Sequence, residues 1–294
     1  MIIIIAGATG FVGAGLARKL ISDGHDVSFL VRPGSRSKIP STVRSNMIYA
    51  DPAGPLEKIE VRADVLINAI GIIREFPGKG ITFQKVHYGI VENLVDFAKT
   101  NGINRFVQIS ALGAGPECRT EYHKSKFAAE ELIRGSGLRW TILRPSMIIG
   151  PGDHVTGLFA GMVKRLPIVP VIGDGNYRLQ PLHIDDLAGG VSALLDKQQA
   201  FDKVFEIGGP DILTYNGLID EIGRVLGKSK VRKIHLPILI TRVMAGIFGR
   251  FGWFPITNEQ LSMLLDGNFT RETAFFELCG VKPRNFRESL TGLL

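Results

Sequence analysis

Short apolar runs alternate with longer amphipathic stretches through the first half of the chain. Runs without a polar face are typical of strands buried on both sides, whereas apolar residues spaced by three and four are typical of helices. The first run, Ile2 to Ala6, leads into an amphipathic helix over about 11–22. The same patterns predict further strands at 26–31, 47–50, 64–68, 105–109 and 140–143, and further helices at 82–100 and 121–134.

This alternation predicts an α/β fold, a doubly wound parallel sheet of the Rossmann type with helices on both faces. Beyond Gly150 the rhythm breaks into shorter elements rich in Gly and Pro. We therefore expect a dinucleotide-binding Rossmann domain over 1–150 and a smaller C-terminal substrate or docking lobe over 151–294. Strands near 178–182 and 203–207 are expected to return to the main sheet. Thr214 and Thr257 are expected to cap helices.

Three glycines at intervals of three follow the first strand. Gly7 permits a sharp turn, Gly10 lets backbone approach a pyrophosphate, and Gly13 lets the next helix pack close to the strand. The phosphates would lie on free N–H groups at the start of that helix. The turn therefore predicts a dinucleotide site, for which we expect contacts from Gly7, Thr9, Gly10, Phe11, Val12, Gly13, Asp51, Asn68, Ala69 and Gly71.

The end of the second strand bears on the choice of dinucleotide. NAD-binding proteins usually carry an acidic residue there, whereas this chain has Arg32, followed by Arg36. A guanidinium at this place would pair with a 2′-phosphate, so Arg32 and Arg36 favour NADP(H) over NAD(H). The alternative is an ordinary solvated basic loop.

Tyr122 and Lys126 stand four residues apart on the predicted helix at 121–134, so they share one helical face. A phenol with a pKa near 10 is a poor acid or base at neutral pH, but a neighbouring lysine and a cationic nicotinamide would favour the phenolate. Proton transfer to a carbonyl oxygen, coupled to hydride transfer, requires such a group. The alternative is an ordinary surface Tyr and Lys.

Several motifs match a known superfamily. GATGFVG at 7–13, YHKSK at 122–126 and LRPS at 143–146 resemble the short-chain dehydrogenase/reductase superfamily, on its extended or atypical branch. Segments at 68–72, 105–113, 143–151, 180–186 and 206–214 resemble the group around the nucleotide-binding accessory subunit of respiratory complex I, the alpha-subcomplex subunit nine type. The resemblance implies Tyr122 as catalytic acid, Lys126 on the nicotinamide ribose, Ser110 as the serine that orients the substrate, and Pro145 beside the cofactor.

The sequence also departs from that pattern. Extended members often carry two adjacent hydroxyls where this chain has Ser110 and Ala111, and many place an asparagine where His87 stands. Two functions therefore stay open. One is an NADP(H)-dependent oxidoreductase that transfers hydride to or from the carbonyl or hydroxyl of a small apolar substrate. The other is a non-catalytic NADPH-binding accessory subunit or assembly factor of a membrane complex of the respiratory type.

The net charge of +7 is concentrated in one segment. Residues 222–258 contain seven basic side chains and no acidic one, so the rest of the chain is formally neutral. Within it, residues 228–254 combine this charge with an aromatic-rich apolar stretch, which suits an anionic membrane surface or a membrane-complex partner; the alternative is a core helix after a basic linker. No nucleic-acid-binding module is recognisable.

The remaining candidates suggest no metal. His183, Asp185 and Asp186 fit helix capping better than a metal site, because no further ligand clusters with them. The two cysteines, Cys118 and Cys279, belong to no metal or disulfide pattern. With no signal-peptide pattern at Met1, these features favour a cytoplasmic protein, peripheral to the membrane if the basic segment docks there.

Overall fold

In the computed structural model, which describes residues 1–38, 47–249, 251–252 and 254–294, strand β1 (Ile2–Ala6) is paired along both edges. Its neighbours are β2 (Asp26–Val31) and β4 (Val65–Asn68), both parallel to it. The other strands of this sheet are β3 (Met47–Tyr49), β5 (Arg105–Ile109), β6 (Arg139–Pro145) and β11 (Lys203–Ile207). Among the described residues the sheet is entirely parallel, in the order β11-β6-β5-β4-β1-β2-β3.

This order confirms the doubly wound sheet. The chain adds β2 and β3 on one side of β1 and then starts again with β4 on the other side. The crossovers therefore diverge between β1 and β4, which leaves a crevice at the carboxyl ends of these two strands. Ala69 N donates to the Ala6 carbonyl at 2.9 Å, so the segments that leave β1 and β4 lie side by side at this point.

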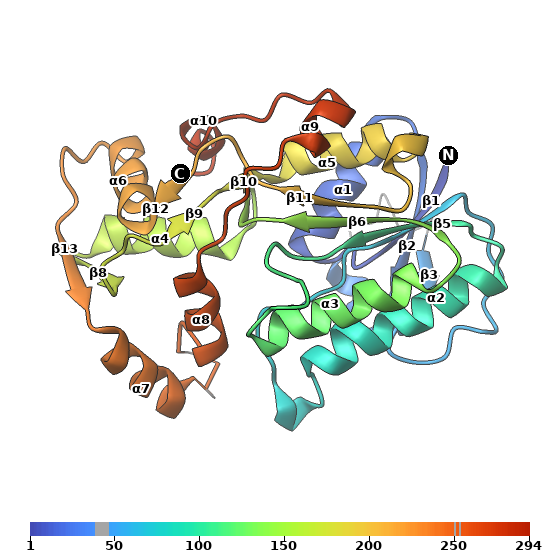
Figure 1. The fold of residues 1–294 in the computed structure, drawn as a ribbon, viewed down its shortest axis with the longest axis horizontal. Helices are drawn as coiled ribbons and strands as arrows, with labels where there is room; N and C mark the ends of the chain where they lie inside the picture. Colours follow the sequence, from blue (N-terminus) through green and yellow to red (C-terminus); the bar gives the residue numbers. More distant parts are fainter. Residues whose placement is uncertain (39–46, 250, 253) are drawn as a thin grey trace. The chain divides into compact units, whose positions relative to one another are not determined.

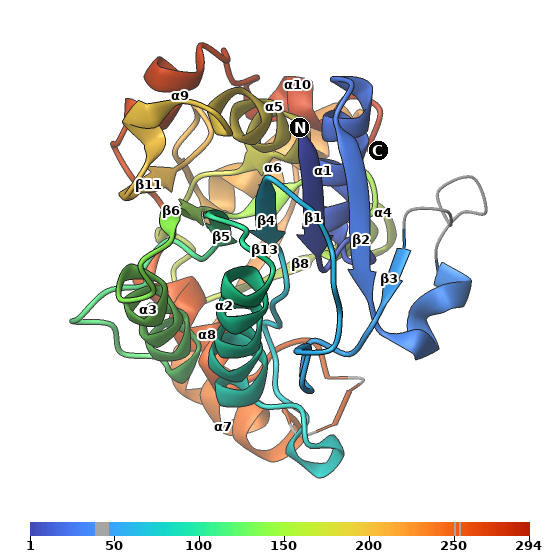
Figure 2. The same ribbon diagram turned by 90° about the vertical axis from the view of Figure 1, so that its right-hand side faces the viewer.

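Helices cover both faces of the sheet (Figures 1 and 2). One face carries α1 (Phe11–Ser22), α5 (Ile184–Leu194) and α9 (Ala274–Cys279), and the other carries α2 (Ile90–Thr100) and α3 (Glu121–Arg134). The helix expected at 82–100 is divided, because a π-helical turn, η4 (Gln84–Gly89), precedes α2. The 3₁₀ turns are η1 (Pro33–Lys38), η3 (Pro77–Lys79) and η5 (Gln198–Ala200).

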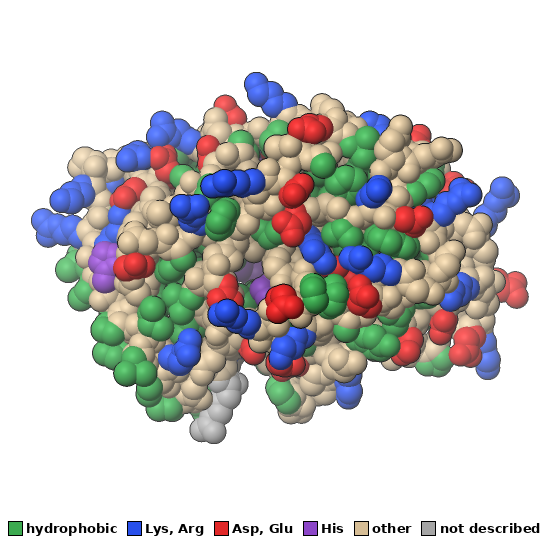
Figure 3. Space-filling view, viewed as in Figure 1, with side chains coloured by type: hydrophobic (Ala, Val, Ile, Leu, Met, Phe, Trp, Pro, Cys, Tyr) green, Lys and Arg blue, Asp and Glu red, His purple; other side chains and the backbone are tan. Residues whose placement is uncertain are grey.

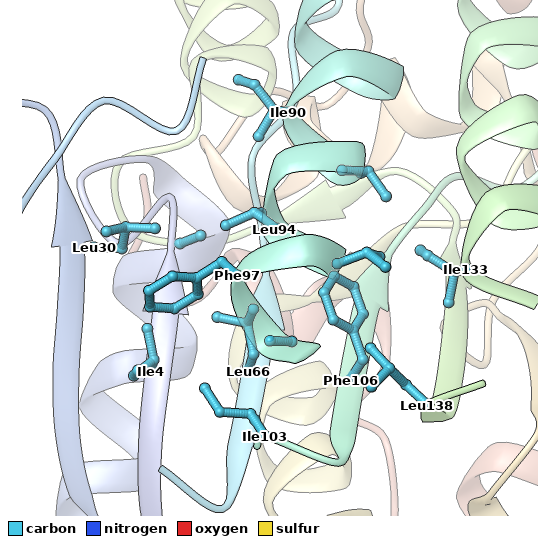
Figure 4. Close-up of a cluster of buried hydrophobic side chains, with 14 of the residues drawn as sticks. Ile4, Leu30, Leu66, Ile90, Leu94, Phe97, Ile103, Phe106, Ile133 and Leu138 are labelled. Carbon is cyan, nitrogen blue, oxygen red and sulfur yellow. The ribbon is translucent and has the colours of Figure 1, made fainter. Parts of the chain in front are cut away.

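The core on the α2/α3 face consists of aliphatic and aromatic side chains from the sheet and the two helices. Figure 4 shows Phe97 of α2 beside Ile4 and Leu66 of the strands, with Phe106 and Ile133 further along. Phe97, Leu66 and Phe106 are at most 1% exposed. On the opposite face α1 and α5 pack closely: a Cβ on Gly15 would lie 2.3 Å from the Ile184 side chain.

The chain divides into two units that are not contiguous in sequence. Unit 1 comprises 1–145, 184–207 and 272–282, and unit 2 comprises 146–183, 208–271 and 283–294. The predicted return strand at 203–207 is therefore confirmed as β11, the outermost strand beside β6. The one expected near 178–182 is wrong, because β9 (Arg178–Leu179) and β10 (Leu182–His183) pair with short strands of unit 2.

Unit 2 is built from short elements. Its strand pairs are β7 (Ile148–Ile149) with β10, β8 (Val169–Ile172) with β13 (Lys233–Leu236), and β9 with β12 (Leu213–Thr214). Its helices are α4 (His154–Arg165), α6 (Tyr215–Val225), α7 (Ile238–Phe248), α8 (Asn258–Asp266) and α10 (Phe286–Leu290). Thr214 and Thr257 cap α6 and α8 as predicted, the latter in a capping box.

Helix α7 is not the core helix that its composition also allowed. Only Thr241 and Ala245 among its described residues are buried, while Leu239 is 73% exposed. The side of α7 that packs on the rest of unit 2 is formed by these two small residues, and the larger aliphatic side chains face solvent. At eleven residues α7 is short, and no helix in the described ranges is long and apolar enough to span a bilayer.

Candidate dinucleotide and proton-transfer site

The glycine turn after β1 has no room for side chains at two of its three glycines. Gly7 has φ +92°, and a Cβ there would lie 2.8 Å from the Ala69 carbonyl carbon. A Cβ on Gly13 would lie 2.3 Å from the Gly7 carbonyl oxygen, which no packing tolerates. Gly10 is the N-cap of α1 and lines the cavity; because glycine has no side chain, it leaves the start of the helix without a side-chain cap.

A cavity of about 340 Å³ lies in unit 1 at this crevice. Seven predicted cofactor residues line it: Gly7, Thr9, Gly10, Arg32, Asp51, Ala69 and Gly71. Phe11, Val12, Gly13, Asn68, Lys126 and Pro145 do not line it, and the side chain of Arg36 lies outside the described part of the structure. The sequence reasoning missed other lining residues, among them Leu30, Ser35, Pro52, Ala53, Ile81, Lys85 and Val86.

Three of the predicted residues that do not line the cavity have structural roles. Asn68 is buried, receives the Ile70 N–H at 3.0 Å and donates to Gln108 Oε1 at 2.9 Å, so it shapes the turn after β4. The Pro145 carbonyl, at the end of β6, accepts from Leu112 N at 3.0 Å and anchors the loop after β5. Gly13 acts through close packing beneath the turn.

Arg32 and Ser35 both line the cavity. Arg32 directly follows β2 and its side chain is exposed, while Ser35 is buried in the η1 turn, its N–H bonded to the Arg32 carbonyl at 2.9 Å. Asp51 also lines the cavity, but one of its carboxylate oxygens already accepts from Ala53 N at 3.0 Å. The end of β2 is therefore followed by the positive charge of Arg32 and, three residues later, by the hydroxyl of Ser35.

Tyr122 and Lys126 lie in the first turns of α3 and are both buried. Burial raises the pKa of Tyr122 to about 12 and lowers the pKa of Lys126 to about 8. The Lys126 ammonium donates to the Ile109 carbonyl at 3.3 Å, and a Cβ on Gly71 would lie 2.9 Å from Nζ. The ammonium is therefore brought to the cavity-lining segment after β4, where any residue larger than glycine would displace it.

His87 connects the segment after β4 to the start of α3. Its Nε2 lies 3.1 Å from Ile72 N and accepts that N–H, so Nδ1 carries the proton and donates to Ser125 Oγ at 2.8 Å. Ser125 Oγ in turn donates to the Tyr122 carbonyl at 2.8 Å. Burial, assisted by the charge of Lys126, lowers the pKa of His87 to about 2, so the imidazole is neutral.

Ser110 is not directed toward Tyr122 and Lys126 in the way that the resemblance implies. It is buried after β5, and its hydroxyl donates to Glu130 Oε1 at 2.5 Å. Glu130 is fully buried and also accepts two bonds from the Arg144 guanidinium, at 3.0 and 2.7 Å. A serine hydroxyl has one proton, so in this arrangement Ser110 has none to give to a substrate oxygen.

The acidic residues at the start of α5 do not form a metal site with their neighbours. Across the described ranges there is no group of three or more His, Cys, Asp or Glu side chains placed to hold a metal ion. His183 ends β10, and Asp185 and Asp186 stand in the first turn of α5. Capping, the other interpretation, suits the acidic pair at a helix start.

The residues present fit a dinucleotide. The cradle at Gly7 and Gly13 that side chains would fill, the uncapped helix start at Gly10 and the cavity along β1, β2 and β4 provide a phosphate site and an adenosine site. Fold and motifs together define an NAD(P)-binding Rossmann protein of the short-chain dehydrogenase/reductase kind. The chain belongs to the NAD dependent epimerase/dehydratase family, whose model matches residues 3–208, and this family binds a nicotinamide cofactor.

Curated relatives carry different names. Over 250 residues the chain is 31% identical to "NADH dehydrogenase [ubiquinone] 1 alpha subcomplex subunit 9, mitochondrial" of Arabidopsis thaliana, covering 82% of this chain and 61% of the relative. It is 31% identical over 195 residues to a ceramide reductase of Caulobacter vibrioides, covering 65% of this chain and 60% of that protein. This chain thus spans about three fifths of the length of each of these two relatives.

Solved structures support the fold. The structure of an NADPH-dependent quinone oxidoreductase from Escherichia coli, complexed with NADPH, superposes with a TM-score of 0.78 and covers 99% of each chain. Its sequence is 18% identical, so the likeness speaks for the fold alone.

Proposed function

We propose that this protein is an NADP(H)-dependent oxidoreductase that transfers hydride to or from the carbonyl or hydroxyl carbon of a small apolar substrate. The observation that carries the proposal is the position of Lys126. Its ammonium lies against Gly71 of the cavity-lining segment, one helical turn from the buried phenol of Tyr122. A cation at this point can bind a ribose hydroxyl and stabilise a phenolate at the same time.

The preference for NADP(H) rests on the end of β2. Arg32 lines the cavity, and its guanidinium matches the geometry of a phosphate better than that of a ribose diol. Ser35, also in the lining, adds a hydroxyl suited to a phosphate oxygen. Asp51 is the acidic residue in the lining, and its bond to Ala53 N ties it to its own turn.

The protein's part in the reaction is the handling of one proton. The bound dinucleotide would supply or accept the hydride. With its pKa raised to about 12, Tyr122 keeps its proton at neutral pH and can donate it to the substrate oxygen. Lys126, charged at pH 7 with a pKa of about 8, stabilises the phenolate that remains. His87 holds the backbone of Tyr122 through Ser125, so that α3 stays in register with the segment after β4.

An apolar substrate is favoured by the surroundings of the phenol. The ring of Tyr122 meets three rings edge-on, with centroid distances of 5.7 Å to Phe83, 5.3 Å to the neutral His87 and 5.1 Å to His123. Both ring nitrogens of His87 are hydrogen-bonded within the protein, and His123 Nδ1 is bonded to Thr120 Oγ1. Quinones and long-chain aldehydes or ketones are therefore the carbonyl compounds to test first.

The proposal is tested by binding and turnover with purified protein. We expect NADPH to bind more tightly than NADH, and Arg32→Ser to weaken NADPH binding by about tenfold to a hundredfold while leaving NADH binding nearly unchanged. Tyr122→Phe keeps the ring but removes the proton, so it should lower turnover by at least about a hundredfold with NADPH binding retained. The measurements are NADPH fluorescence titrations and NADPH oxidation with a panel of apolar carbonyl compounds.

Matched controls are present in the same chain. Arg62→Ser removes an exposed arginine outside the cavity lining, and Tyr49→Phe removes an exposed phenol on β3. Both should behave like the wild type. Equal affinity for the two dinucleotides in wild type and Arg32→Ser would refute the cofactor assignment, and full activity of Tyr122→Phe would refute the proton-transfer role.

A second function is favoured by the state of Ser110. Its hydroxyl is committed to Glu130, and Ala111 offers no replacement, so the site lacks the substrate-orienting hydroxyl of catalytic relatives. The protein would then hold NADPH as a structural element of a membrane complex; the Arabidopsis relative is named as a subunit of such a complex, NADH dehydrogenase. Stopped-flow displacement of NADPH separates the two: release within seconds fits turnover, whereas retention for hours fits a structural cofactor.

A further inference from the structure

Helix α7 exposes an aliphatic stripe to solvent. Its most exposed members are Leu239, Ile240, Val243 and Ile247, which are between 54% and 73% exposed. Leu239, Val243 and Ile247 are spaced by four, and Ile240 lies beside them on the same side of the helix. Met244 and Phe251 continue the stripe at 42% and 40%. We call these six residues the α7 stripe. Figure 3 shows hydrophobic side chains gathered over α7.

The opposite side of α7 accounts for this orientation. Thr241 and Ala245, the buried residues of the helix, are small, and the Thr241 hydroxyl bonds back to the Pro237 carbonyl at 3.3 Å. An amphipathic helix that completes a core does the reverse and turns its large residues inward. Isolated exposed aliphatic residues need no explanation, but a continuous stripe of this kind marks an interaction surface.

The charged side chains of α7 and of the segment that leads into it are all basic. Arg242 is exposed on α7 itself, and Lys230 and Arg232 are exposed just before β13, the strand that leads into the helix. The 222–258 segment contains no acidic residue at all. Lys233 is less available to an anionic partner than these three, because its ammonium is paired with the Asp220 carboxylate at 2.5 Å.

The aliphatic stripe and the basic side chains together indicate the kind of partner. A helix too short to span a bilayer, with a broad aliphatic side and cationic flanks, lies in the interface of an anionic membrane: the aliphatic groups enter the acyl boundary and the cations meet the phosphates. We propose that α7 docks unit 2 on an anionic lipid surface. The proposal is independent of the function proposed for the cavity, since no residue of the α7 stripe lies in unit 1.

The test is co-sedimentation of the full chain with vesicles of phosphatidylcholine alone and of equal parts phosphatidylcholine and phosphatidylglycerol. We expect partitioning to the mixed vesicles that weakens as salt is raised. Leu239→Ser combined with Val243→Ser and Ile247→Ser should lower it by more than about tenfold, because each change removes an aliphatic group that would enter the membrane. Arg232→Gln with Arg242→Gln should lower it by about tenfold, and only on anionic vesicles.

The matched control uses exposed aliphatic residues of unit 1. Ile21 and Ile73 are 43% and 55% exposed, and Ile21→Ser with Ile73→Ser should bind vesicles like the wild type. All substituted residues are exposed, so circular dichroism melting should be unchanged in every variant. Wild type that stays in the supernatant overturns the proposal, and so does equal partitioning of all variants. A wild-type dimer in sedimentation equilibrium that the triple serine variant abolishes would also overturn it, because the stripe would then bind a second copy.

Discussion

Gly13 is the residue at which the dinucleotide turn is least tolerant of change. An added Cβ would lie 2.3 Å from the Gly7 carbonyl oxygen, and both groups belong to backbone that cannot yield without moving β1 or α1. We predict that Gly13→Ala lowers the free energy of unfolding by about 3 kcal/mol and weakens dinucleotide binding. Urea unfolding followed by circular dichroism measures the first effect, and NADPH titration the second.

Gly157 provides the comparison. It lies in α4 with nothing within 4 Å of an added Cβ, so Gly157→Ala should raise stability by about 0.5–1 kcal/mol through helix propensity and leave NADPH binding alone. If the two alanine variants were equally stable, the close packing of Gly13 beneath the turn would not contribute to the free energy of unfolding.

The residues at the turn were predictable because their signal is local. Gly7, Gly10 and Gly13 follow an apolar run, and Tyr122 and Lys126 share a helix, so sequence spacing alone predicted their placement at the turn after β1 and on α3. Ser110 was not predictable in the same way. Its hydroxyl is taken by Glu130, twenty positions along the chain, and nothing near either residue indicates that bond.

At the scale of elements, the π-helical turn at η4 is the feature with most consequence for the site. It places Lys85 and Val86 in the cavity lining and His87 between Ile72 and Ser125. Turns of this kind often occur at functional sites. The periodicity of 82–100 predicts an unbroken helix because it reports the apolar face that packs on the sheet. The hydrogen bonds that His87 makes to two distant segments do not affect this periodicity, so the sequence gives no sign of the π-helical turn.

The same turn predicts a pH dependence of stability. His87 has a pKa of about 2 when folded and about 6.5 when unfolded, so the unfolded chain binds the extra proton as the pH falls below 6.5. Its contribution to stability is therefore complete above that pH and is lost progressively toward pH 2. Between pH 7 and pH 5 the loss amounts to about 2 kcal/mol.

The comparison that isolates this contribution is His87→Gln. The variant keeps an acceptor and a donor but does not titrate, so its stability should fall less steeply with acid than that of the wild type. Urea midpoints measured for both proteins at several pH values give the difference directly. Parallel curves would mean that His87 is protonated in the folded protein, contrary to its hydrogen bonds.

At the scale of the molecule, unit 1 depends on segments from far along the chain. Lys203–Ile207 pairs with Thr141–Pro145 as β11 on β6, and Ile184 packs into the space left at Gly15 of α1. The sequence predicted β11 but gave no sign that α5 and α9 cover the same face as α1. Such contacts depend on shape complementarity between helices, which hydrophobic periodicity does not encode. For the same reason the sequence left two interpretations of residues 228–254 open, a docking segment and a core helix, and only the structure shows which side of α7 is exposed.

This dependence predicts that residues 1–150, the domain expected from sequence, do not fold alone. The fragment would leave β6 as an unpaired edge and expose the α5-facing side of α1. We expect no cooperative urea transition for the fragment under conditions in which the full chain unfolds sigmoidally. A sigmoidal transition for 1–150 would show that the later segments add stability without being required for folding.

The way the chain passes between the two units has a further consequence, for the timing of folding during synthesis. The chain leaves or re-enters unit 1 after residues 145, 183, 207, 271 and 282. A ribosome that has made the first 150 residues has therefore translated every strand of the large sheet except β11, and α9 is translated only after almost all of unit 2. Until β11 is made, β6 is an unpaired edge of the nascent sheet. Slower translation between residues 150 and 203 would therefore lengthen the time during which this edge is exposed to chaperones and to misassembly.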